Sequence, residues 1–207
     1  MNPTLILASA SPRRRELLAQ AGYLFEVQAS SVDESRRSGE DAIRFATRLA
    51  REKAEHVAAQ RPSSAHPTLI LGADTVVVCD GEILGKPADA ADARRMLLLL
   101  SGRTHSVVTG VAVVGRPQVV EVAAEVTQVT VRTLSLQAIA DYVATGEPMD
   151  KAGAYAIQGY AARWIPRISG CYFNVVGLPL ALVASLLEGV EPRLASQTVA
   201  ARSLSLG

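Results

Sequence analysis

Two hydroxyls and three guanidinium groups follow a short apolar run near the start of the chain. Residues 5–8 are Leu-Ile-Leu-Ala, and residues 9–15 are Ser-Ala-Ser-Pro-Arg-Arg-Arg. The apolar run predicts a buried strand, and Ser11 before Pro12 is typical of a helix N-terminus, where serine caps backbone N–H groups and proline lacks one. Cations oppose the helix dipole at this end, so an anion bound between them would relieve the conflict. The segment indicates a phosphate-binding turn, with a solvated basic turn as the alternative. Its candidate ligands are Ser9, Ser11, Arg13 and Arg14.

Carboxylates are the second set of groups that could do chemistry. Asp74 follows Gly72-Ala73 and stands between two apolar runs. This places it in or near the core, where an unpaired carboxylate is costly. Asp33 and Glu34 lie in a polar loop. Paired carboxylates beside a phosphate suit Mg²⁺ or Mn²⁺, so Asp74 and Glu34 are the candidate metal ligands. A turn-forming Asp74 and a solvated Glu34 are the alternatives.

The lysines are informative because arginine supplies eighteen of the twenty-one cationic side chains. The three lysines are Lys53, Lys86 and Lys151. An ammonium is a compact point charge that fits a phosphate oxygen in a tight site, whereas a guanidinium needs a planar space. Helical spacing places Lys53 on or beside the buried stripe of its helix. Lys53 and Lys86 are therefore candidate phosphate ligands.

Composition excludes several classes of protein. Hydrophobic residues make up 49% of the 207 residues and charged residues 20%, which is typical of a globular protein. A net charge of +1 gives no reason to expect a nucleic acid or an anionic membrane as partner. No signal-peptide pattern and no 18-residue apolar span is visible, so we expect a cytoplasmic protein. Cys79 and Cys171 are expected to be buried thiols, and the histidines have no metal-ligand spacing.

Alternating strand and helix patterns predict an α/β protein with a mixed sheet. Asp80-Gly81 is a strong hairpin turn. Strands are predicted at residues 5–8, 24–27, 68–71, 76–79, 104–114, 119–131, 154–157 and 164–165. Helices are predicted to begin at Pro12 and to cover residues 43–57, 89–100, 136–144 and 178–187.

Seven short blocks follow one another in order between residues 4 and 188. They are Ser9-Ala10-Ser11-Pro12-Arg13-Arg14, Arg51-Glu52-Lys53-Ala54, Gly72-Ala73-Asp74-Thr75, Gly85-Lys86-Pro87, Asp150-Lys151-Ala152-Gly153-Ala154-Tyr155, Ile157-Gln158-Gly159 and Val176-Gly177-Leu178-Pro179. In combination they resemble the Maf family of nucleoside triphosphate pyrophosphatases, once described as septum-formation inhibitors. The resemblance implies an elongated mixed β-sheet with flanking helices, two lobes around a cleft, and a fold related to that of the inosine triphosphate pyrophosphatases.

The resemblance also implies a reaction and its residues. The expected activity is cleavage of dTTP or UTP between the α- and β-phosphates, releasing the monophosphate and pyrophosphate. Asp74 is expected to act as general base, and Asp74 and Glu34 to hold Mg²⁺ or Mn²⁺. The expected phosphate ligands are Ser9, Ser11, Arg13, Arg14, Lys53 and Lys86.

Three positions are expected to select the nucleobase: Arg13, Thr75 and Gln158. By resemblance, the dTTP/UTP subgroup has these residue types, whereas the 7-methyl-GTP subgroup has Trp, Gln and Glu. An amide offers both a donor and an acceptor, which matches the O4/N3–H edge of a pyrimidine. The alternatives are a 7-methyl-GTP or other purine pyrophosphatase, and a non-catalytic nucleotide-binding regulator of cell division.

The domain organisation follows from the extent of the blocks. We expect a single Maf-like domain of two lobes over residues 1–190 and a flexible C-terminal tail at residues 191–207. The expected partner is the nucleoside triphosphate substrate, and a homodimer is compatible with the sequence.

Overall fold

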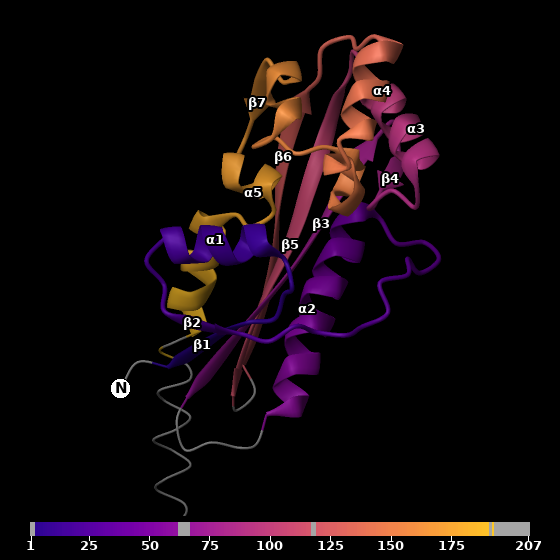
Figure 1. Ribbon diagram of the computed structural model, residues 1–207. Helices are drawn as coiled ribbons and strands as arrows, with labels where there is room; N and C mark the ends of the chain where they lie inside the picture. The colour runs from indigo at the N-terminus through magenta and orange to yellow at the C-terminus, as the bar shows by residue number, and fades with distance from the viewer. Residues whose placement is uncertain (1–2, 62–66, 117–118, 191, 193–207) are drawn as a thin grey trace, which may run out of the picture. The chain divides into compact units, whose positions relative to one another are not determined.

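The computed structural model describes residues 3–61, 67–116, 119–190 and 192 (Figure 1). All of the predicted tail except residue 192 lies outside these ranges. The elements are β1 (Thr4–Leu7), α1 (Pro12–Gln20), β2 (Phe25–Val27), α2 (Ala42–Gln60), β3 (Thr68–Cys79), β4 (Glu82–Leu84), α3 (Ala90–Leu100), β5 (Thr104–Arg116), β6 (Val119–Thr130), α4 (Leu136–Ala144), the 3₁₀ helices η1 (Glu147–Asp150), η2 (Ala152–Ala154) and η3 (Tyr160–Trp164), β7 (Arg167–Ser169) and α5 (Tyr172–Val176). Residues 180–190 are also helical.

The strands form one mixed sheet with the order β2-β1-β3-β5-β6-β7, and β4 pairs with β3. β1 pairs in parallel with both β2 and β3, whereas β3–β4 and β6–β7 are antiparallel. The predicted α/β class with a mixed sheet and flanking helices is therefore confirmed. None of the helices in the described ranges combines the length and apolar composition that a membrane span needs.

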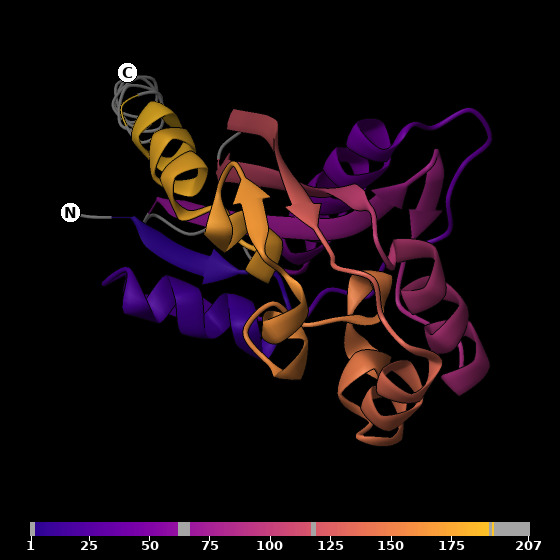
Figure 2. The same ribbon diagram turned by 90° about the horizontal axis from the view of Figure 1, so that it is seen from above.

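The chain divides by its internal contacts into two compact units. The first unit comprises Met1–Asp74, Gly110–Ala124 and Leu178–Gly207, and the second comprises Thr75–Thr109 and Glu125–Gly177. In the first unit, β1 leads into α1, which lies alongside it (Figure 2). In the second unit, α3 and α4 pack together beside the short 3₁₀ helices.

β3 is continuous through Gly72-Ala73-Asp74-Thr75, so the predicted break in this strand was wrong. Gly72 does not form a turn. It lies directly against the backbone of α2, where there is no room for a side chain. A Cβ atom at Gly72 would come within 2.1 Å of the Ala50 carbonyl oxygen and 3.0 Å of the Ala54 nitrogen. Glycine inside a strand often marks such a close backbone approach. Asp74 consequently lies within a strand.

β5 contacts the same helix in the same way. A Cβ atom at Gly110 would lie 2.3 Å from the Ala46 carbonyl oxygen. Ala46, Ala50 and Ala54 are fully buried, and their small side chains permit the contact. The position of α2 is therefore set by backbone packed on backbone in the first unit.

Two predicted strands of the second unit were also wrong. Residues 154–157 and 164–165 form no strand; Ala154 ends η2 and Trp164 ends η3. Gly153 and Ala154 have left-handed backbones with φ of 68° and 58°, which interrupts an extended chain. The hairpin at Asp80-Gly81 is confirmed, with positive φ at both residues. The short elements β7 and α5 were not predicted.

The contact between Gly72 and α2 yields a prediction about stability. Gly72→Ala would push a methyl group into a backbone carbonyl that cannot rotate away, so we expect the free energy of unfolding to fall by about 3 kcal/mol. Urea denaturation measures this loss. Gly189→Ala is the matched control, because a Cβ atom at Gly189 meets nothing within 4 Å. Equal stability of the two variants would contradict the close packing of α2 on β3.

Candidate functional site

The hydroxyl groups of Ser9 and Ser11 accept hydrogen bonds from within the turn before α1 and from the first turn of that helix. Ser11 is the N-cap of α1, and its side chain accepts a hydrogen bond from the Arg14 backbone N–H at 3.5 Å. Ser9 is only 6% exposed, and its hydroxyl accepts from the Ser11 N–H at 3.2 Å and from Arg14 Nη1 at 3.3 Å. The predicted serine cap with proline at the first helical position is confirmed.

Arg14 connects this turn to β3. Its Nη1 donates to the Ala73 carbonyl oxygen at 2.7 Å, at the residue before Asp74. Burial lowers the pKa of Arg14, the Asp74 carboxylate raises it, and the charges of Arg13 and Glu34 act in opposite directions. Arginine nevertheless stays charged in proteins. The guanidinium is thus a fixed cation among acidic groups.

A buried ammonium joins the two candidate metal ligands. Lys53 Nζ lies 2.6 Å from Asp74 Oδ1 and 2.6 Å from Glu34 Oε1. Lys53 and Asp74 are 7% and 8% exposed, whereas the Glu34 side chain is half-exposed. The three side chains come from α2, β3 and the loop before α2. Two carboxylates therefore converge on one cation in the first unit.

The structure brings six of the predicted site residues together in this unit. Arg14 and the bridging Lys53 link the turn, the strand and the loop. The six are Ser9, Ser11, Arg14, Glu34, Lys53 and Asp74. Arg13, also in the first unit, is half-buried, and its positive charge lowers the pKa of Arg14. Within the described ranges, no group of three or more His, Cys, Asp or Glu side chains could hold a metal ion.

The remaining three predicted residues belong to the second unit. Thr75 Oγ1 lies 2.9 Å from Thr109 Oγ1 and 3.5 Å from the Gly177 carbonyl oxygen. Lys86 is exposed on the loop after β4. Gln158 is exposed in the turn between η2 and η3.

The backbone on both sides of Gln158 is held by two side chains. The Ala156 N–H donates to Tyr142 Oη at 3.2 Å, and the Tyr160 N–H donates to Glu147 Oε1 at 3.1 Å. Tyr142 in turn donates its phenolic proton to Glu147 at 2.9 Å. Burial, together with this bond, raises the pKa of Tyr142, so the phenol stays protonated. The turn is fixed while the Gln158 side chain is exposed.

Gly159 lies against the same carboxylate. A Cβ atom there would lie 2.1 Å from Glu147 Oε1. A larger residue at position 159 would therefore displace the Glu147 carboxylate from its bonds to Tyr142 and to the Tyr160 N–H. Tyr142 and Glu147 could not be predicted as partners of this turn, since nothing local in the sequence relates them to Gln158.

The third lysine, the two cysteines and His105 have other contacts. Lys151 pairs with Asp150 and donates to the Glu147 carbonyl oxygen at 2.9 Å. Both cysteines are free thiols; Cys79 is buried as predicted, whereas Cys171 is only half-buried, so the prediction of a buried thiol was wrong there. His105 lies in the core, 2.8 Å from Tyr155 Oη, and burial lowers its pKa to about 4.

Comparison with known proteins places this α/β chain in a family. The Maf-like protein family matches residues 4–190, so the chain belongs to the Maf-like proteins. A dTTP/UTP pyrophosphatase of Koribacter versatilis is 55% identical over 184 residues, covering 89% of this chain and 93% of the relative. One from Salmonella typhimurium is 52% identical over 185 residues, covering 89% and 92%. One from Geobacter sulfurreducens is 54% identical over 187 residues, covering 90% and 96%.

One solved structure has a much lower similarity to this chain. The nucleoside-triphosphatase / dITP/XTP pyrophosphatase of Mycobacterium abscessus has a TM-score of 0.39 and 17% sequence identity, covering 63% of this chain and 75% of that one. This likeness is too weak to carry an argument about the site.

The bridging lysine yields a prediction about stability. Lys53→Met removes the counter-ion that the buried Asp74 shares with Glu34. We expect the free energy of unfolding to fall by about 3 kcal/mol, as for other broken buried ion pairs. Arg51→Met is the matched control on the same helix, because its exposed pair with Glu55 contributes at most about 0.5 kcal/mol. A loss for Lys53→Met no larger than the control's would contradict a stabilising role for the ammonium.

Proposed function

We propose that this protein hydrolyses dTTP and UTP to the nucleoside monophosphate and pyrophosphate. The observation that carries the proposal is the convergence of Asp74, Glu34, Lys53 and Arg14 in a protein of the Maf-like family. Relatives with 52–55% identity over nine-tenths of the chain bear the name dTTP/UTP pyrophosphatase. Carboxylates beside fixed cations are suited to cleaving a charged phosphoanhydride.

A divalent cation fits the two carboxylates. Asp74 and Glu34 already hold one cationic group, the Lys53 ammonium, at 2.6 Å each. Mg²⁺ is usually held by one or two carboxylates together with substrate phosphates and water, which is what this donor set offers. Asp74 and Glu34 would hold Mg²⁺ or Mn²⁺, whose charge would neutralise phosphate oxygens.

The chain's own residues account for the remaining chemistry. Asp74 accepts the proton of the attacking water as its oxygen bonds to the α-phosphorus. The bond from the α-phosphorus to the bridging oxygen breaks, and pyrophosphate leaves with that electron pair. Arg13, Arg14, Lys53 and Lys86 neutralise the charge that develops on the phosphate oxygens, and the hydroxyls of Ser9 and Ser11 add hydrogen bonds.

Base selection is assigned to Arg13, Thr75 and Gln158. Gln158 presents an exposed amide from a fixed turn. Such an amide can donate to O4 and accept from N3–H of a pyrimidine. A site that pairs both groups rejects a base that would leave its own polar groups unpaired.

The surroundings of the enzyme complete the proposal. We assign residues 1–190 to one catalytic domain of two lobes, in a cytoplasmic protein that acts on free nucleotides. A homodimer is compatible with this role. Removal of nucleotides, modified pyrimidine forms included, before they enter DNA or RNA is the biological role that fits such an activity.

The first test concerns Asp74. Asp74→Asn keeps the side-chain shape but removes the base, so kcat should fall by about 10²–10⁴-fold. Release of pyrophosphate from dTTP, UTP, GTP, ATP and 7-methyl-GTP measures this, with Asp141→Asn on the exposed face of α4 as control. Unchanged turnover in Asp74→Asn would remove the general base from the mechanism. Nucleotide binding without turnover in the unaltered protein would favour the non-catalytic regulator.

The second test concerns the choice of base. Gln158→Glu replaces a donor and acceptor with an acceptor-only group, so kcat/KM for dTTP should fall by the equivalent of about 1–3 kcal/mol relative to 7-methyl-GTP. Gln137→Glu, also an exposed amide of the second unit, should leave this ratio unchanged. A preference of the unaltered protein for the methylated purine would favour the alternative subgroup, even if the chemistry is the same.

A further inference from the structure

The loop that carries Glu34 is long and irregular. Residues 28–41 connect β2 to α2 without a helix or strand. Loops of this length inside a compact domain are uncommon and usually functional. The loop has no regular backbone ladder to fix it, yet Glu34 has to stay within reach of Lys53. Side chains must therefore hold it.

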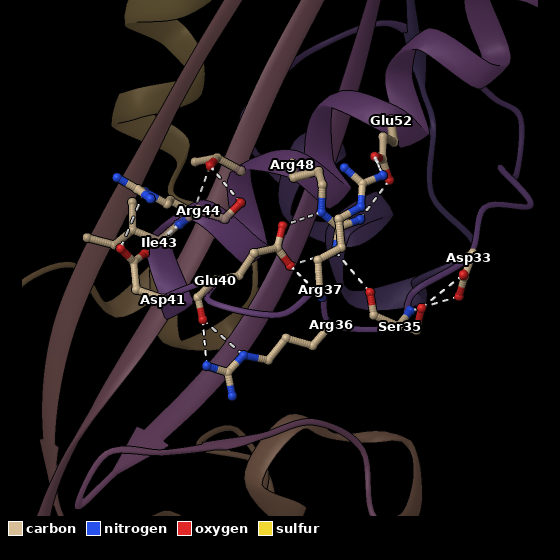
Figure 3. Close-up of polar contacts among 11 residues, drawn as sticks. Asp33, Ser35, Arg36, Arg37, Glu40, Asp41, Ile43, Arg44, Arg48 and Glu52 are labelled. Atoms are coloured by element: carbon tan, nitrogen blue, oxygen red, sulfur yellow. Dashed lines mark hydrogen bonds and ion pairs between the residues drawn. The ribbon is translucent and has the colours of Figure 1, made fainter.

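Arg48 of α2 supplies most of that hold (Figure 3). Its Nε donates to Glu40 Oε1 at 2.5 Å and its Nη2 to Glu40 Oε2 at 2.9 Å, which makes a bidentate, two-point salt bridge. Nη2 also donates to the Ser35 carbonyl oxygen at 2.9 Å, and Nη1 pairs with Glu52 at 2.9 Å. One guanidinium thus connects helix α2 with both ends of the segment 35–40.

Further contacts close the network around this guanidinium. Arg37 donates its backbone N–H to Glu40 at 2.9 Å and pairs with Glu52 at 2.8 Å. Asp33 accepts from the backbone N–H and the hydroxyl of Ser35, both at 2.9 Å. Figure 3 shows Glu40, Arg37 and Glu52 around the Arg48 guanidinium, with Asp33 joined to Ser35 beside them. Ser35 is therefore bonded directly to α2 through Arg48, and Asp33 is bonded to Ser35.

The Arg48–Glu40 pair differs from an ordinary surface ion pair. Exposed pairs contribute little because solvent screens them and both side chains are free to move. Here both side chains are only 12% exposed, and the geometry is two-point. Bonding to Arg48 lowers the pKa of Glu40 to about 2, and the same bond raises the pKa of Arg48. The pair consequently stays charged at every pH used in a neutral assay.

We propose that Arg48 is a positioning residue, which holds the 28–41 loop through Glu40 and the Ser35 carbonyl so that Glu34 reaches Lys53. Arg48 and Lys53 lie on the same helix, and Ser35 follows Glu34 directly. Helix α2 therefore contacts the loop at two adjacent residues: Arg48 bonds to the backbone of Ser35, and Lys53 bonds to the carboxylate of Glu34. Its consequence for catalysis rests on the proposed function, whereas its effect on the loop does not.

Limited proteolysis tests the effect on the loop without any assay of activity. Trypsin cleaves after Arg36 and Arg37, and cleavage follows the population of the open loop when opening is fast. In Arg48→Met we expect cleavage at these two bonds, identified by mass spectrometry, to be about tenfold faster. Arg48→Lys keeps the positive charge but lacks the planar guanidinium, so its cleavage rate should lie between those of Arg48→Met and the unaltered protein. Arg44→Met is the control, because Arg44 forms an exposed 3.7 Å pair with Asp41 on the same helix.

Kinetics test the consequence for the site. Misplacing a catalytic group by about 1 Å can cost on the order of 100-fold in rate, so kcat of Arg48→Met on dTTP should fall by about 10–100-fold. The Mg²⁺ concentration for half-maximal rate should rise, with little change in KM for the nucleotide. A thermal melt of each variant checks folding. Glu40→Gln, which removes the two-point pair but leaves Arg48 and Glu52, replaces Arg48→Met if that variant does not fold.

The outcomes separate the two proposals. Cleavage at the rate of the unaltered protein in both Arg48→Met and Glu40→Gln overturns the positioning role. Faster cleavage with unchanged kinetics also overturns it, because the loop then has no bearing on the site. An unaltered protein inactive on every nucleotide refutes the proposed function, while the cleavage rates still decide whether Arg48 holds the loop.

Discussion

The site in the first unit depends on one buried ammonium between two carboxylates. Lys53 and Asp74 are both withdrawn from water, and their attraction offsets the lost hydration only if their geometry is good. That geometry follows from the contact of α2 with Gly72, two residues before Asp74 on β3. A larger residue at Gly72 would move the helix and with it the lysine. A backbone contact thus sets a charge–charge distance.

Helix α2 connects the charged groups of this unit with one another. Its buried face carries the small residues Ala46, Ala50 and Ala54 against the sheet and also the buried Lys53. Lys53 and Arg48 both extend to the loop that carries Glu34. The guanidinium of Arg14 approaches the same carboxylates from α1. The charged network therefore has its fixed points on regular elements, while the acidic partner with the greatest exposure, Glu34, comes from the loop. Rigid elements position charges more reliably than a loop does.

Local patterns in the sequence predicted most of the elements but not the contacts between them. Ser11 and Pro12 identify the start of α1, and helical spacing identifies α2, because caps and periodicity are local. The strand break predicted at Gly72 was wrong, since a glycine that admits a neighbouring backbone has the same local appearance as one that ends a strand. Residues 154–157 have the composition of a strand, and the left-handed backbone of Gly153 and Ala154 is not apparent from composition. The contacts of Arg48 with Glu40 and Ser35 could not be predicted, because they join a helix to an irregular loop.

The fixed turn around Gln158 has a consequence for how enzymes of this kind can diverge. Tyr142 and Glu147 hold the backbone from outside the turn, so the exposed side chain at position 158 contributes little to folding. Exchanging it costs little stability, and marginally stable proteins tolerate such exchanges most readily. The buried alanines of α2 allow no comparable freedom. Under the proposed role of Gln158 in base selection, an altered substrate range is therefore accessible by single substitutions at an exposed position, without any change to the buried charged cluster.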